Sequence, residues 1–524
     1  MHSVEIPERF NAATFLLDRH LAEGRGDKVA LMCRGQSWTY REVQREVNRL
    51  GNALRGLGVE IENRVFLLSP DVPELVFGLL ASMKIGAVPI AANTLLPAAD
   101  IAYILRDSRA KVAIVHESLL EPVEAARPTL AHLRRVVVIG EGGRGHLAYR
   151  DLVAAAGEEL SAADTCRDDS AVWQYSSGTT GVPKGIVQMH RNILCHFESY
   201  AHALLGITED DRFLSVAKLF FGYGQGNSLY LPFGAGATTI LMPDRPEPDT
   251  IAELVTRERP TVFCGVPTAY NAMLALPRFT EAFDFRSVRL CLSAGEALPP
   301  AVQEGWKAAW NLDIVDGIGA TECYHIFISN RPEEITPGST GRPLPGVGVR
   351  LVDEDGADVG PGEIGNVLVR AGFVAAGYWN KHELSQRTFL GEWVKTGDKF
   401  SRDEEGRFWF AGRGDDMIKS GGIWVAPIEV EATLGLHPAV AECGVIGSPD
   451  PQSLVKPKAY VVLRSGWTPS PELTGELQQF VKDRIAPYKY PRWIEYVSEL
   501  PKTATGKLQR FKLRQADAQA KRSE

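Results

Sequence analysis

The sequence lacks paired cysteines, a long uninterrupted hydrophobic run and an excess of positive charge. Without a C-x-x-C pair, its odd number of scattered cysteines is a poor pattern for a disulfide framework or a zinc site and fits a reducing compartment. The most apolar stretch, residues 72–96, is broken by prolines, a glycine and charges, which excludes a membrane span there. The net charge, 57 − 65 = −8, argues against sequence-independent nucleic-acid binding.

The first residues, MHSVEIPERF, lack the basic and then apolar segments of a signal peptide. Histidines 190, 196 and 202 are six residues apart, which is the wrong spacing for one helical face and argues against a metal site. We therefore expect a cytoplasmic protein that binds neither nucleic acid nor a membrane.

Apolar strand patterns alternate with helical patterns over the first 340 residues or so, which predicts α/β layers with largely parallel sheets. The clearest helix follows Thr39, which forms a capping box with Glu42, and ends at Gly58. A further helix should reach about Lys84. The predicted strands cover residues 64–69, 111–115, 135–140, 171–177, 261–266, 289–295 and 312–319.

From about residue 340, short alternating strands with Gly and Asp turns predict a β-rich subdomain. A compact α+β module follows, with a strand at 458–464 and a helix beginning at Ser470, and the polar tail after Leu513 should be frayed. We thus expect an α/β fold: a large N-terminal domain, 1–414, of layered α/β subdomains plus the β-rich one, and a small mobile C-terminal α+β domain, 416–524.

The stretch YSSGTTGVPKG, residues 175–185, holds three glycines, two serines, two threonines and one lysine. Unshielded backbone N–H groups, hydroxyls and one ammonium suit a phosphate cradle, although the G-x-x-x-x-G-K-[ST] pattern is absent. The stretch follows the predicted strand 171–177 at its carboxyl end, where ligands bind in open α/β sheets. A surface loop that binds nothing has a similar composition.

Four further stretches carry charged groups next to glycines: GIGATE (317–322), TGD (396–398), GRGDDMIKSGG (412–422) and PKTATGKLQR (501–510). Each alone has an ordinary interpretation, as a strand exit, a tight turn, a solvated hairpin or a loop with a solvated lysine. In this order and spacing, the five stretches together resemble the adenylate-forming superfamily of acyl-CoA synthetases, adenylation domains and firefly-type luciferases. The resemblance covers essentially the whole chain up to Leu513.

The resemblance implies a reaction in two halves. A carboxylate first attacks the α-phosphate of ATP to give an acyl-adenylate and pyrophosphate, and a thiol then displaces AMP. In that family the cradle residues surround the β- and γ-phosphates; here they are Ser177, Thr179, Thr180 and Lys184. Glu322 would help to hold Mg²⁺, and Thr321 would contact the α-phosphate.

For the nucleoside, the resemblance implies an adenine wall of Gly295, Glu296 and Ala297, with Asp316 near the amino edge of the base. Asp398 would hold the ribose hydroxyls with help from Arg413. Lys507 would bridge the acyl carboxylate and the α-phosphate in the first half-reaction. Asp415 would be the hinge of the C-terminal domain, and Gly421 and Gly422 would line the tunnel for the pantetheine of coenzyme A.

The stretches KLFFGYGQGN (218–227) and ATECYHIFISN (320–330) resemble the benzoate-CoA ligase branch. By that resemblance the aryl ring would contact Gly222, Tyr223, His325 and Ile326, with Lys419 nearby. The alternative that His325 is an ordinary packed, hydrogen-bonded histidine stays open. The branch usually carries alanine where this chain has Gly222. The missing methyl favours an ortho substituent, so 2-aminobenzoate (anthranilate) stands beside benzoate, unless the glycine serves a turn whose φ is forbidden to alanine.

The sequence therefore predicts an aryl-CoA ligase that uses ATP, Mg²⁺ and coenzyme A. The alternative acceptor is the phosphopantetheine thiol of an acyl carrier protein. A non-catalytic scaffold is disfavoured because the charged residues of all five stretches are retained. By resemblance to bacterial acyl-CoA synthetases, Lys507 would be a target of a lysine acetyltransferase and a deacetylase.

Overall fold

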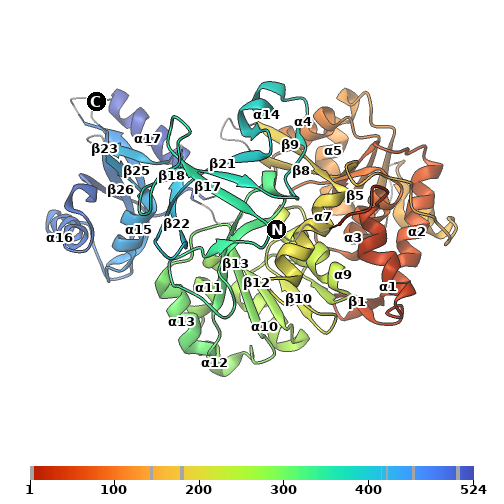
Figure 1. Ribbon diagram of the computed structural model, residues 1–524, viewed down its shortest axis with the longest axis horizontal. Coiled ribbons are helices and arrows are strands. Elements are labelled where there is room, and N and C mark those ends of the chain that lie inside the picture. The colour runs from red at the N-terminus through yellow and green to blue at the C-terminus, as the bar shows by residue number, and fades with distance from the viewer. Residues whose placement is uncertain are drawn as a thin grey trace. The chain divides into compact units, whose positions relative to one another are not determined.

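The structure is a computed structural model that describes residues 5–141, 145–177, 182–414, 416–420, 423–450, 455–502 and 508–523 (Figure 1). The chain divides into two compact units. Unit 1 comprises Met1–Pro337, Gly341–Gly348 and Val369–Val394, and unit 2 comprises Gly338–Thr340, Val349–Leu368 and Lys395–Glu524. Residues 395–414 thus cluster with the C-terminal residues. The hinge at Asp415 stays a prediction, because that residue lies outside the described ones.

A nine-stranded sheet of order β16-β15-β14-β13-β12-β10-β11-β1-β2 forms one layer of unit 1. Its middle strands are parallel, as predicted: β1 (Val29–Cys33), β10 (Arg212–Ser215), β11 (Thr238–Leu241), β12 (Val262–Gly265), β13 (Leu290–Ala294) and β14 (Ile314–Gly319). The outer strands are antiparallel to their neighbours: β2 (Gln36–Thr39) at one edge, and β15 (Ile326–Ser329) with the edge strand β16 (Arg342–Pro343) at the other. Helices α10 (Pro248–Glu258), α11 (Pro267–Leu274) and α13 (Pro300–Trp310) contribute to its core.

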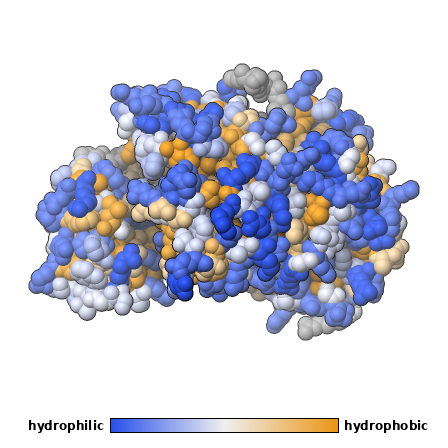
Figure 2. All heavy atoms as spheres, turned by 90° about the horizontal axis from the view of Figure 1, so that it is seen from below, coloured by the Kyte–Doolittle hydropathy of each residue, from blue (hydrophilic) through white to orange (hydrophobic). Residues whose placement is uncertain are grey.

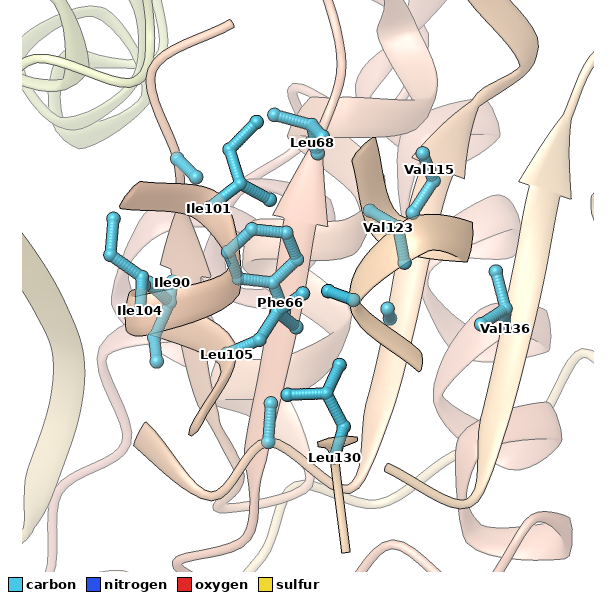
Figure 3. Packing of buried hydrophobic residues seen from close by; sticks show 14 of the residues in the cluster. Phe66, Leu68, Ile90, Ile101, Ile104, Leu105, Val115, Val123, Leu130 and Val136 are labelled. Atoms are coloured by element: carbon cyan, nitrogen blue, oxygen red, sulfur yellow. The ribbon is translucent and has the colours of Figure 1, made fainter. Parts of the chain in front are cut away.

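A second, parallel sheet of unit 1 has the order β4-β3-β5-β6-β7. Its strands are β3 (Arg64–Leu68), β4 (Val88–Ala91), β5 (Val112–His116), β6 (Arg135–Ile139) and β7 (Leu147–Ala148). Figure 3 shows Phe66 of β3 packed with Ile101 and Leu105 of helix α4 (Ala98–Ser108), and Val123 of α5 (Leu120–Ala126) belongs to the same core. The predicted α/β layering is confirmed.

Helix α2 (Tyr40–Gly56) begins as its sequence predicts. The Thr39 hydroxyl accepts from the Glu42 N–H at 3.2 Å, and the Glu42 carboxylate accepts from the Thr39 N–H at 2.8 Å. This reciprocal capping box satisfies two backbone donors that a helix start leaves open. Helix α3 (Pro73–Lys84) also ends at the predicted residue.

The phosphate-cradle stretch follows the predicted strand, but that strand does not belong to a parallel sheet. Strand β8 (Ser170–Ser177) pairs antiparallel with β9 (Pro183–Met189), which pairs with β19 (Gly377–Tyr378) in a three-stranded sheet. The prediction that this stretch leaves the carboxyl end of a parallel strand is therefore wrong. The ladder runs to Ser177↔Pro183, so the described residues at the two ends of the stretch belong to the paired strands of one hairpin. Ile186 and Val187 after the cradle suit a pleated strand, a signal that the sequence prediction did not use.

A five-stranded sheet has the order β17-β18-β21-β20, with β22 (Phe408–Arg413) paired to β21 (Trp393–Arg402). Its other strands are β17 (Gly348–Val352), β18 (Gly365–Arg370) and β20 (Phe389–Leu390). The C-terminal module holds the sheet β25-β26-β27 (Val440–Pro449, Val455–Leu463, Trp493–Tyr496). Helices α15 (Pro427–Gly435) and α16 (Pro471–Lys482) share its core, and Ser470 caps α16 as predicted.

The tail after Leu513 is not frayed: it belongs to helix α17 (Arg510–Ser523). Asp517 of this helix is buried and accepts from the Lys458 ammonium and the Ser448 hydroxyl, both at 2.8 Å. The prediction of a frayed tail was wrong because the polar composition of the tail does not reveal that one of its carboxylates is buried and paired inside the module.

No helix in the described parts of the chain is both long and apolar enough to span a membrane. Hydrophilic side chains cover most of the face that Figure 2 shows, with hydrophobic ones spread among them.

Candidate active site

Three side chains of unit 1 form a compact polar cluster at the base of the phosphate-cradle hairpin. The Lys184 ammonium, on β9, donates to Glu322 Oε1 at 2.8 Å and lies 2.9 Å from the Tyr378 hydroxyl of β19. The Tyr378 hydroxyl donates to the same Glu322 oxygen at 2.6 Å. Two of these residues were predicted site residues, and the structure brings them together. Tyr378 was missed because no sequence motif marks it.

Charge neutralisation keeps the Glu322 carboxylate ionised. Burial acts to raise the pKa of Glu322, but the ammonium of Lys184 and the hydrogen bonds outweigh it, so the pKa is lowered. Burial, and then the neighbouring carboxylate, raise the pKa of Tyr378. At neutral pH the cluster therefore holds a carboxylate, an ammonium and a neutral phenol, an arrangement suited to binding a polyanion together with a cation.

A strained turn follows Glu322. Tyr324 has φ +67° and ψ −55°, and the His325 N–H donates to the Cys323 carbonyl at 2.7 Å. These dihedral angles and this bond define a γ-turn of the rare positive-φ kind, which costs free energy in a residue with a bulky side chain. The turn lies between the charged cluster on one side and the predicted aryl-site residues His325 and Ile326 on the other.

Two predicted aryl-site residues are in contact. The rings of Tyr223 and His325 stack with centroids 5.4 Å apart and an interplanar angle of 18°, and His325 Nε2 lies 3.3 Å from the Tyr223 carbonyl. His325 is 4% exposed, and burial lowers its pKa to about 4, so the imidazole is neutral at pH 7. The missed neighbour is Gly226, where a Cβ would lie 2.3 Å from His325 Nε2.

Gly222 begins helix α8 (Gly222–Gln225), and its φ lies outside the positive region. The alternative prediction, that its φ is forbidden to alanine, is therefore wrong. A Cβ at this position would lie 3.3 Å from Gln174 Nε2 and 3.5 Å from the Tyr324 carbonyl, which is tight but not impossible. Gln174 is a further residue that the sequence prediction missed.

The predicted adenine-site residues lie on neighbouring parallel strands. Asp316 of β14 is in register with Ser293 of β13, and Gly295 directly follows β13 with φ +92°. Glu296 and Ala297 are half-buried. Burial raises the pKa of Asp316 to about 8, which the nearby Ser293 hydroxyl and Gly317 N–H oppose only in part. Burial therefore favours the protonated carboxyl of Asp316 at neutral pH.

This pKa gives a testable pH dependence. The pKa is about 8 in the folded protein against a usual 3.8, so the folded state binds the proton more tightly. The contribution of Asp316 to stability is thus greatest at low pH and falls as the pH rises from about 4 to about 8. We expect Asp316→Asn to raise the melting temperature relative to the wild type at pH 8 but not at pH 4.

The control for this prediction is Asp313→Asn, which changes an exposed carboxylate that is paired with Lys307. Melting temperatures measured by scanning calorimetry across this range should show no pH-dependent gain for the control. The same temperature difference for Asp316→Asn at both pH values would contradict the raised pKa.

In unit 2, the predicted ribose-site pair is joined directly. Arg413 Nη1 donates to Asp398 Oδ1 at 2.9 Å, across the antiparallel pairing of β21 with β22. The preceding Gly397 has φ +80°, and a Cβ there would lie 3.2 Å from Arg413 Nη2, so the turn needs glycine. Asp398 itself is buried.

Several predicted site residues lie outside the described ones: Thr179, Thr180, Asp415, Gly421, Gly422 and Lys507, with the side chains of Ser177 and Lys419. Each of the three histidines singled out for their spacing contacts a different group. His190 accepts from the Ala12 N–H, His196 lies 3.2 Å from the Ile326 carbonyl, and His202 pairs with Glu198.

Two family models match the chain: "AMP-binding enzyme" over residues 18–379 and "AMP-binding enzyme C-terminal domain" over residues 429–507. A benzoate–CoA ligase of Thauera aromatica is 47% identical over 98% of this chain and 97% of its own length. A 4-hydroxybenzoate–CoA/benzoate–CoA ligase of Rhodopseudomonas palustris is 43% identical over 97% and 94%.

Solved structures agree with these relatives. An anthranilate CoA ligase in complex with anthranoyl-AMP superposes with a TM-score of 0.94 at 46% identity, covering 98% of both chains. A benzoate CoA ligase from Burkholderia xenovorans superposes with a TM-score of 0.89 at 44% identity, covering 96% of this chain and 100% of that one. The chain therefore belongs to the AMP-binding family of adenylate-forming enzymes.

Proposed function

We propose that this protein is an aryl-CoA ligase, which activates benzoate or 2-aminobenzoate with ATP to an aryl-AMP and then transfers the aryl group to coenzyme A. One observation carries the proposal beyond the family. Within unit 1, Glu322, which pairs with Lys184, is only three residues along the chain from His325, which stacks on Tyr223. A polyanion site thus adjoins a flat aromatic surface that suits a planar ring.

In the first half-reaction, a carboxylate oxygen attacks the α-phosphorus while the bond to pyrophosphate breaks. Both reactants are anions, so the protein has to neutralise and position them. Lys184 would bind the β- and γ-phosphates with Ser177, Thr179 and Thr180, and Thr321 would contact the α-phosphate. The ionised Glu322 suits Mg²⁺, a hard cation that prefers oxygen ligands and would offset phosphate charge.

By family resemblance, the residues predicted for the nucleoside would hold its adenine and its ribose. Asp316, whose protonated form is favoured by burial, would lie at the edge of adenine, and Gly295, Glu296 and Ala297 would cover its face. The Asp398 carboxylate, fixed by Arg413, would accept from the ribose hydroxyls.

In the second half-reaction, the thiol of coenzyme A attacks the carbonyl carbon of the aryl-AMP, its proton is lost, and AMP leaves. Lys507 would act in the first half-reaction and then withdraw as the chain turns at Asp415. Gly421 and Gly422 would line the pantetheine path, with Lys419 nearby. An acyl carrier protein is the alternative thiol donor.

Acetylation of Lys507 by a lysine acetyltransferase would remove the charge of its ammonium and stop adenylation. An assay of aryl-AMP formation by the acetylated enzyme, before and after a deacetylase, tests this prediction.

A panel of aromatic acids, assayed for AMP formation with and without coenzyme A, tests this function. We expect AMP release that needs an aromatic acid and that accelerates with coenzyme A. Acceleration by a phosphopantetheinylated carrier protein instead would favour the alternative acceptor. Activity with acetate or fatty acids but with no aromatic acid would overturn the proposal.

A further inference from the structure

Three polar atoms surround the space that the missing methyl of Gly222 leaves. A Cβ there would lie 3.3 Å from Gln174 Nε2, 3.5 Å from the Tyr324 carbonyl oxygen and 3.6 Å from Gln174 Oε1. One of these atoms is a donor and two are acceptors. The space beside Gly222 is therefore a polar niche, and we call these three atoms with Gly222 the Gln174 niche.

A chain of buried amides fixes how the Gln174 side chain is oriented. Gln188 Nε2 donates to the Thr321 carbonyl at 2.6 Å, and a carbonyl can only accept, so this end of Gln188 is its nitrogen. The same nitrogen lies 3.2 Å from Gln174 Oε1, and Gln174 Nε2 then donates to Gln225 Oε1 at 3.0 Å. The hydrogen-bond network thus determines which end of the Gln174 amide is the oxygen and which is the nitrogen.

The Gln174 amide can form hydrogen bonds in addition to those of this amide network. An amide nitrogen carries two N–H groups and an amide oxygen two lone pairs, and the bonds named above use one of each. Gln174 is 5% exposed, so the remaining capacity points into protein or into whatever occupies the niche. A buried polar group without a partner costs free energy, which a hydrogen-bonding ligand group would recover.

We propose that Gln174 is a specificity-determining residue, which selects aromatic acids whose ortho substituent donates a hydrogen bond. This inference rests on the proposed function, because it places the aryl ring beside Gly222. An ortho amino or hydroxyl group in the niche donates to the second lone pair of Gln174 Oε1, the first of which accepts from Gln188. An ortho methyl or chloro group of similar size fills the same space and leaves that second lone pair unused. The niche therefore discriminates between ortho substituents by their ability to donate a hydrogen bond as well as by their size.

The test compares benzoate, 2-aminobenzoate and 2-methylbenzoate by acid-dependent exchange of pyrophosphate into ATP. For the wild type we expect kcat/KM for 2-aminobenzoate to exceed that for 2-methylbenzoate about tenfold, the scale of one neutral hydrogen bond. Gln174→Met keeps the length of the side chain and removes both polar atoms. It should bring that ratio close to one, while benzoate provides the internal reference.

Two further variants test the niche through its neighbours. Gln188→Met removes the donor that orients the Gln174 amide, so it should lower the amino-to-methyl ratio part of the way toward one. Gly222→Ala fills the niche, so it should lower both ortho-substituted acids about tenfold relative to benzoate. If Gln174→Met leaves the ratio at its wild-type value, or lowers all acids alike, Gln174 is structural and the inference fails.

The failure of the function is distinguishable from the failure of the inference. If no aromatic acid supports exchange, the aryl-CoA ligase proposal itself is wrong. If benzoate supports exchange and the wild type handles the amino and methyl acids equally, the function stands and the role of Gln174 is refuted.

Discussion

Replacing Lys507 with alanine should lower the rate of aryl-adenylate formation at least about a hundredfold, the scale of losing one group that stabilises transition-state charge. The acyl carboxylate and the α-phosphate are both anionic, and by family resemblance Lys507 is the cation that they share. The same variant should convert supplied aryl-AMP to aryl-CoA at a rate close to that of the wild type. Pyrophosphate exchange measures the first rate, and aryl-CoA formation from synthetic aryl-AMP measures the second.

The chain offers a matched control in Lys502, which precedes Lys507 in the same sequence stretch. Lys502 is bridged to Leu508, and its ammonium pairs with Glu442 at 2.6 Å inside the C-terminal module. Lys502→Ala removes the same charge from an exposed ion pair, so both half-reactions should stay within about twofold of the wild type. Equal losses in both half-reactions for Lys507→Ala would contradict the idea that this lysine serves adenylation alone.

Replacing Asp415 with proline should give the opposite pattern, with adenylation preserved and transfer to coenzyme A reduced by orders of magnitude. The residues on either side of Asp415 are held. The Gly414 N–H donates to the Gly397 carbonyl at 2.8 Å, and Asp416 pairs with Arg514 at 2.6 Å and Arg510 at 3.5 Å. A rotation about residue 415 would have to break the bonds that the Asp416 and Met417 N–H groups donate to the Arg413 carbonyl at 3.0 and 3.1 Å. Proline at 415 would fix φ near −65° and so oppose such a rotation.

The control is Asp415→Ala, which removes the carboxylate but keeps both the N–H and the freedom of φ. It should retain both half-reactions if the backbone, not the side chain, is what matters at this position. Single-turnover measurements of aryl-AMP formation and of aryl-CoA formation separate the two steps. A parallel fall of both rates in Asp415→Pro would place the hinge elsewhere.

Local signals in the sequence predicted the parts of the fold that local chemistry decides. The capping box at Thr39 and Glu42 sets the start of α2 whatever packs against it, and the apolar run at 64–68 makes a buried strand in any α/β layer. The pairing of strand 170–177 was missed because residues 183–189 were not recognised as a strand, although they follow closely in the chain. The pairing of that second strand with 377–378 is not local, so no short sequence pattern could predict it.

The site was predictable to the same extent. The motifs carry Lys184 and Glu322, which were predicted for the phosphates and Mg²⁺ but not as a directly bonded pair. Tyr378 lies 56 residues beyond Glu322 and bears no motif of its own. Gln174 was hidden for a different reason, because it looks like an ordinary polar residue inside a strand. Its importance emerges only when the space above Gly222 is known.

The γ-turn at Tyr324 has a consequence for how new substrates could be acquired by mutation. It joins Glu322 to His325 through a single strained residue, so an insertion or backbone shift that reshapes the ring side also displaces the carboxylate. Laboratory evolution toward other acids should therefore accumulate changes of side-chain volume at 222, 223 and 174. Variants with insertions or deletions between residues 321 and 326 should be absent from libraries that have been selected for activity.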